Sequence, residues 1–152
     1  MSVLVSSLKS MVRNLIGDID STNYRFEDAA ITSAIQDAVY DFNADIRVGQ
    51  EYDILGTGNA QYYSPDITDK HKRIMAYFAA VIMLLGELAK AGRDAISYSN
   101  PAGSTNTTSV PGSISTALNN MKGKLESLLN EESSLGISGD VSCSEITTQK
   151  RG

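Results

Sequence analysis

The sequence predicts an all-α fold: a small bundle of about four helices with an extended arm or hairpin, a long polar loop and an extended C-terminal tail. Three observations support this prediction. Apolar residues recur at three- and four-residue spacing in four separate segments, which is typical of amphipathic helices. Hydrophobic residues make up 41% of the 152 residues, enough for a small core. The small polar residues gather mainly in two segments, one before and one after the last helix.

The first predicted helix spans residues 4–17, and Gly17 suits the left-handed conformation that ends many helices. The second spans residues 27–46, and Glu27 and Asp28 place negative charge at its positive end. Polar residues occupy the rest of its circumference, which favours a solvated face over an acid/base site. Its predicted apolar stripe consists of Ile31, Ile35, Ala38, Val39, Phe42 and Ile46.

The segment between these helices, residues 18–26, has two aspartates spaced as in a calcium-binding loop. However, Asn23 stands where that loop needs glycine, and Ala29 stands where it needs a bidentate glutamate. We therefore expect a plain connection here. Residues 47–67 place short β-rich runs on both sides of the sequence GTGNA, which predicts a hairpin or an extended arm.

The third predicted helix spans residues 67–91 and is apolar around more than half of its circumference, so it should be packed on several sides. Gly92 is the expected terminator. Its longest apolar stretch, residues 74–89, already contains Glu87, which favours a buried core helix over a membrane span. His71 lies among basic residues in the first turn and is expected to be exposed.

Residues 93–112 form the predicted polar loop, and residues 113–132 form the last predicted helix. Together with the preceding helices they make a predicted helical domain over residues 1–132. Residues 133–152 are then an extended tail, which either adds to a neighbour's surface or is a frayed terminus. We expect partner contacts from the apolar residues of the loop and the tail, namely Tyr98, Leu135, Ile137, Val141 and Ile146.

Composition narrows the function classes. The formal net charge of −5 argues against a domain that grips DNA by neutralising phosphates. A single cysteine, Cys143, and a single histidine exclude a disulfide framework and a zinc cluster of such residues within the chain. No Ser/His/Asp set, phosphate loop or secretory signal pattern is recognisable. We therefore expect no enzyme activity, no cofactor, no metal and no membrane insertion.

The order of these segments resembles the head–tail connector proteins of tailed bacteriophages, also called adaptor or head-completion proteins. Three stretches carry the resemblance: LIGDIDSTNYRFEDAAITSAIQDAVYDFNADI at 15–46, YYSPDITDKHKRIMAYFAAVIMLLGELA at 62–89, and DAISYSNPAGSTNTT at 94–108. Glu27 departs from the family pattern, in which serine or threonine caps the second helix. The family's aromatic-x-aromatic signature, followed by aspartate and an apolar helix, is met by Tyr24, Phe26, Asp28 and Ile31.

The resemblance implies a non-catalytic virion protein at the head–tail interface, or neck, made in the cytoplasm of the bacterial host. Such subunits form a ring, commonly a dodecamer, that binds the portal protein and a downstream neck, stopper or tail protein. DNA passes through the ring without sequence-specific binding. Two alternatives stay open: another neck, tail-completion or stopper protein, and a small helical DNA-binding packaging subunit that uses the basic cluster at residues 70–73.

Overall fold

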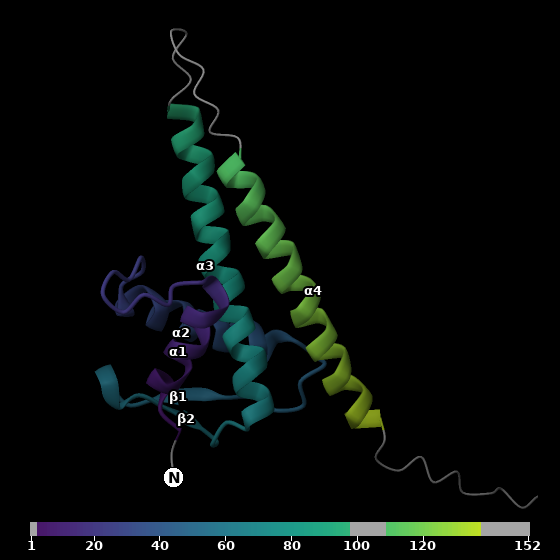
Figure 1. The fold of residues 1–152 in the computed structure, drawn as a ribbon. Helices are drawn as coiled ribbons and strands as arrows, with labels where there is room; N and C mark the ends of the chain where they lie inside the picture. The colour runs from purple at the N-terminus through teal and green to yellow at the C-terminus, as the bar shows by residue number, and fades with distance from the viewer. Residues whose placement is uncertain (1–2, 98–108, 138–152) are drawn as a thin grey trace, which may run out of the picture.

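The computed structural model describes residues 3–97 and 109–137, of which only the backbone is described at 94–97, 109–111 and 135–137. The fold is mostly helical with a small two-stranded sheet, which confirms the all-α prediction at that level (Figure 1). In chain order the elements are η1 (Val5–Leu8), α1 (Lys9–Ile16), α2 (Asp28–Ala44), β1 (Asp53–Leu55), η2 (Gly58–Ala60), β2 (Tyr62–Ser64), α3 (Asp69–Ser97) and α4 (Ser109–Ile137).

The long helix α3 is the centre of the fold, because α1, α2 and α4 all pack against it. The lower half of α3 lies within the body formed by α1, α2 and the hairpin, whereas its upper half extends beyond that body beside α4 (Figure 1). The core lies where these elements meet. Its fully buried large side chains include Leu8, Ile31, Ile35, Phe42, Tyr52, Tyr63, Ile74, Met75 and Leu129.

The helix predicted over 4–17 is a 3-10 helix, η1, followed by α1, and the helix predicted over 27–46 is α2. Gly17 adopts a φ of 74° at the end of α1, and the Asp18 amide donates to the Arg13 carbonyl at 2.9 Å, so the left-handed cap is confirmed. On α2 the predicted apolar stripe is buried up to Phe42. Ile46 is the exception, since α2 ends at Ala44 and leaves the Ile46 side chain 98% exposed.

The predicted hairpin is also present. Strand β1 pairs antiparallel with β2, in a register that places Ile54 opposite Tyr63. Gly56 permits the turn, because its φ is 87° and a Cβ atom there would lie 2.8 Å from the Ala60 carbonyl oxygen. The start of the chain joins this sheet through the Tyr63 amide, which donates to the Val3 carbonyl at 3.1 Å.

The two long helices exceed their predicted bounds. Helix α3 continues through Gly92 to Ser97, and α4 begins at Ser109, so the polar loop is shorter than the predicted 93–112. Helix α4 also runs to Ile137, five residues beyond the predicted helix end at residue 132. An internal glycine costs a helix about 1 kcal/mol relative to alanine. The two long helices pack against each other, and such packing stabilises a helix despite this cost.

Candidate functional site

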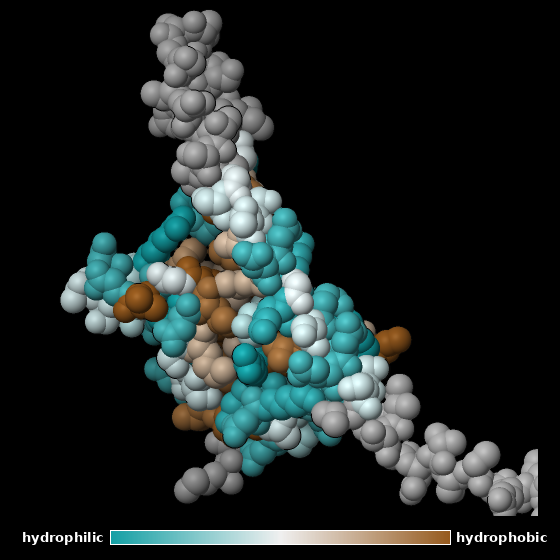
Figure 2. Space-filling model, turned by 45° about the vertical axis from the view of Figure 1, so that its right-hand side comes forward, coloured by the Kyte–Doolittle hydropathy of each residue, from teal (hydrophilic) through white to brown (hydrophobic). Residues whose placement is uncertain are grey.

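An apolar surface lies along the upper half of α3. Leu85 is 43% exposed, and Ile82 and Leu88, three positions before and after it on the same side of the helix, are half-buried against the core. Figure 2 shows hydrophobic residues gathered in the middle of one face, bordered by hydrophilic residues. Leu85 is thus the exposed centre of a partly buried apolar strip on α3.

Lower down, a groove opens between α1, α3 and α4. It consists of two adjoining hollows, of about 250 and 350 Å³, which share Leu15 and Tyr77 in their walls. Polar groups at its edges include the exposed cations Arg73 and Lys124. We call this the α1/α3/α4 groove. Its remaining apolar lining comes from Met11, Ala76, Ala117 and Met121.

The outward side of α2 carries a different surface, which we call the α2 face and define as Asp37, Tyr40, Asp41 and Ile46. The Tyr40 side chain is 74% exposed, and Ile46 follows just beyond the helix end. The two aspartates are exposed beside them. The α2 face therefore combines two exposed apolar or aromatic side chains with two carboxylates.

His71 is buried, which contradicts the prediction of an exposed surface group. Only 8% of its surface is exposed. Its Nδ1 lies 2.7 Å from the Tyr52 hydroxyl and its Nε2 lies 3.1 Å from Glu132 Oε1, while its ring packs edge-on against Phe42. Both ring nitrogens thus have partners within the chain. The sequence contains no local signal for this, because Glu132 lies 61 positions away.

The same carboxylate also binds the ammonium group of Lys70. Lys70 Nζ lies 2.6 Å from Glu132 Oε2, so α3 holds the C-terminal part of α4 through two adjacent side chains. Burial alone would raise the pKa of Glu132, but the hydrogen bonds from Lys70 and His71 outweigh burial and lower that pKa below its ordinary value of 4.5. Burial raises the pKa of the neighbouring Tyr52 phenol.

A pH dependence of stability follows from Glu132. Because its pKa is lowered on folding, its contribution is fully present above about pH 4.5 and is lost as the pH falls through the lower folded pKa. We expect Glu132→Gln to be less stable than the parent at pH 7 and to lose less stability between pH 5 and pH 3. Urea unfolding at several pH values measures both effects. The neighbouring exposed Glu131→Gln is the control, and equal pH slopes for parent and Glu132→Gln would contradict the assignment.

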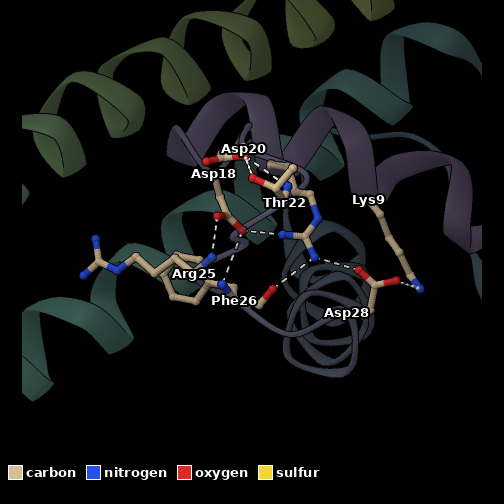
Figure 3. A network of polar contacts seen from close by, with 8 residues as sticks. Lys9, Asp18, Asp20, Thr22, Arg25, Phe26 and Asp28 are labelled. Carbon is tan, nitrogen blue, oxygen red and sulfur yellow. Dashed lines mark hydrogen bonds and ion pairs between the residues drawn. The ribbon is translucent and has the colours of Figure 1, made fainter.

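A second polar cluster centres on Arg13 and joins α1 to the following connection and to α2 (Figure 3). The buried guanidinium pairs with the buried Asp18 carboxylate, donates to the Phe26 carbonyl at 3.0 Å, and reaches Asp28 Oδ1 at 2.6 Å. Hydrogen bonding from Arg13 lowers the pKa of Asp28. Asp18 also accepts the Arg25 amide at 2.7 Å. Asp18 and Asp20, the two aspartates spaced as in a calcium-binding loop, thus lie in the connection between α1 and α2. There Asp18 orders the backbone by accepting its amides.

The basic cluster at residues 70–73 is largely neutralised within the chain. Lys70 pairs with Glu132, and Lys72 Nζ lies 2.8 Å from Asp69 Oδ1. His71 is buried. Arg73 is exposed and lines the α1/α3/α4 groove.

No family model, curated protein or solved structure matches the chain. Among the described residues, no group of three or more His, Cys, Asp or Glu side chains is placed to hold a metal ion. One helix, over Asp69–Arg93, is long and apolar enough to cross a membrane by length and composition, a test that core helices of soluble proteins also pass.

The predicted partner contacts fall where the structure gives no side chains. Tyr98, Val141 and Ile146 lie outside the described residues, and Leu135 and Ile137 lie in the last turn of α4, where only the backbone is described. They stay predictions. Sequence reasoning missed the groove, because its walls come from three helices far apart in the chain.

Proposed function

We propose that this chain is a structural subunit of a bacteriophage neck, which assembles as a ring between the portal and the tail or neck components. The ring extends the DNA channel and offers a docking platform to the portal protein on one side and to a neck, stopper or tail protein on the other. DNA passes through it without sequence-specific binding, and the subunit resides in the virion after synthesis in the host cytoplasm. The family resemblance of the sequence motivates this proposal.

The observation that carries it is the exposed apolar surface of α3. A third of the residues in the most apolar stretch of α3 are buried within the single chain, several others are half-buried, and Leu85 is 43% exposed. Leaving such a surface in water is unfavourable, and covering it with another protein removes that cost. Side-to-side contacts between copies, closed by rotation, cover it in every subunit of a ring.

The charge distribution supports this function over DNA gripping. Three of the four residues in the basic cluster at 70–73 are paired or buried within the chain, which leaves few cations at that position to neutralise phosphates. A net charge of −5 suits a conduit that releases DNA. If the chain were instead a stopper or tail-completion protein, it would still be a structural assembly protein, and only the virion protein that it binds would differ.

The test is the mass of the full chain, measured by native mass spectrometry and checked by electron microscopy of negatively stained particles. We expect closed rings that bind the cognate portal. Leu85→Glu, which places a charge on the apolar surface of α3, should weaken assembly. Leu55→Glu is a matched control, because Leu55 is also 43% exposed but lies on β1. A full chain that stays monomeric and does not bind the portal would overturn the proposal.

A further inference from the structure

We propose that neighbouring copies of this chain bind head-to-tail, with the α2 face of one copy seated on the α1/α3/α4 groove of the next. This inference rests on the self-assembly in the proposed function and names two surfaces that meet in addition to the apolar surface of α3. The occupant of the groove is therefore a second copy, and the contact repeats from subunit to subunit.

The apolar parts of the two surfaces match. The groove offers a depression lined by Met11, Leu15, Tyr77 and Met121, open to solvent in the single chain. The α2 face offers Tyr40 and Ile46, two of the most exposed large apolar or aromatic side chains among the described residues. Inserting an exposed aromatic side chain into a preformed hollow is a common way to anchor a protein interface.

The charges around these apolar parts are opposite. Arg73 and Lys124 lie at the edges of the groove, and Asp37 and Asp41 flank Tyr40 on the α2 face. Within the described residues none of these four forms an ion pair, unlike Arg13, Arg25 and Arg47. Complementary charges at the border of an interface select the partner and fix the register.

The position of the two surfaces decides the symmetry. The groove lies among α1, α3 and α4. The α2 face belongs to a different helix, α2, which packs against α3 as α4 does. Two different surfaces that bind each other form a heterologous contact. Such a contact leaves one free surface at each end of a pair, so association continues until a rotation closes the ring.

Charge reversal tests this contact in the full chain. Variant A carries Asp37→Lys with Asp41→Lys, and variant B carries Arg73→Glu with Lys124→Glu. Each variant alone would place like charges across every contact, so we expect each to assemble at least about tenfold more weakly than the parent. An equimolar mixture of A and B pairs opposite charges at every contact and should restore rings of alternating subunits. A matched control is Lys122→Glu with Glu51→Lys, two exposed charges outside both surfaces.

The readout is native mass spectrometry of A, B, their mixture and the control. Rings from the mixture but not from A or B alone would support the head-to-tail contact. Rings from A and from B alone would overturn it while leaving the proposed function intact. Variant B rings that fail to bind the portal would assign the groove to the portal and also overturn it. A monomeric parent would instead overturn the proposed function itself.

Discussion

Replacing Arg13 with alanine is expected to destabilise the chain by about 3–5 kcal/mol, the usual cost of removing one partner of a buried ion pair. Both Arg13 and Asp18 are buried, so the variant leaves a buried Asp18 carboxylate without its cation. It also frees the Phe26 carbonyl and Asp28 from the guanidinium. Equilibrium unfolding in urea, followed by circular dichroism, measures the loss.

Two further variants make this expectation specific. Lys9→Ala removes an ion pair with the same Asp28, but that pair is exposed and spans 3.5 Å, so we expect a loss of less than about 1 kcal/mol. Adding Asp18→Asn to Arg13→Ala removes the stranded charge and should recover part of the lost stability. If Arg13→Ala were no more damaging than Lys9→Ala, the Arg13 cluster would not hold the connection in place.

Local periodicity predicted the helical core well, because burial on an amphipathic helix is visible in the spacing of its apolar residues. The stripe of α2 from Ile31 to Phe42 and the glycine cap at Gly17 both needed only neighbouring residues. Helix ends were harder to predict. Gly92 resembled a terminator, yet α3 continues through it to Ser97 and packs against α4, a helix that begins only at Ser109.

The polar clusters were not predictable for a related reason. Arg13 and Asp18 are five positions apart, and their pairing depends on the turn at Gly17 that brings the chain back. The fate of His71 depends on Tyr52 and on Glu132, which come from the hairpin region and from the far end of α4. A lone histidine among lysines is consistent with exposure until the tertiary fold places it. The sequence therefore predicts which apolar residues are buried, but not which polar residues form hydrogen bonds or ion pairs with one another.

These clusters have a common structural consequence. Arg13 fixes the connection between α1 and α2, Arg47 joins the end of α2 to Glu126 on α4 at 2.6 Å, and Glu132 joins α4 to the start of α3. The lower body is thus held by polar contacts around its apolar core. The upper half of α3 has fewer neighbours in the single chain, which leaves its apolar residues available to another copy.

Replacing His71 with alanine is expected to cost about 3 kcal/mol, from the cavity left beside Phe42 and from the loss of two buried hydrogen-bond partners. The damage should be local first: amide hydrogen exchange around Glu132 should accelerate before the rest of the core opens, because Glu132 loses one of its two polar partners on α3.

A matched pair of variants separates the causes. His71→Phe fills the ring space but forms neither hydrogen bond, so its loss of stability should lie between those of the parent and His71→Ala. Lys72→Ala removes only an ion pair with a nearly fully exposed Asp69, and it should have little effect. If His71→Ala matched Lys72→Ala in both stability and exchange, His71 would be a surface group after all, as the sequence alone suggests.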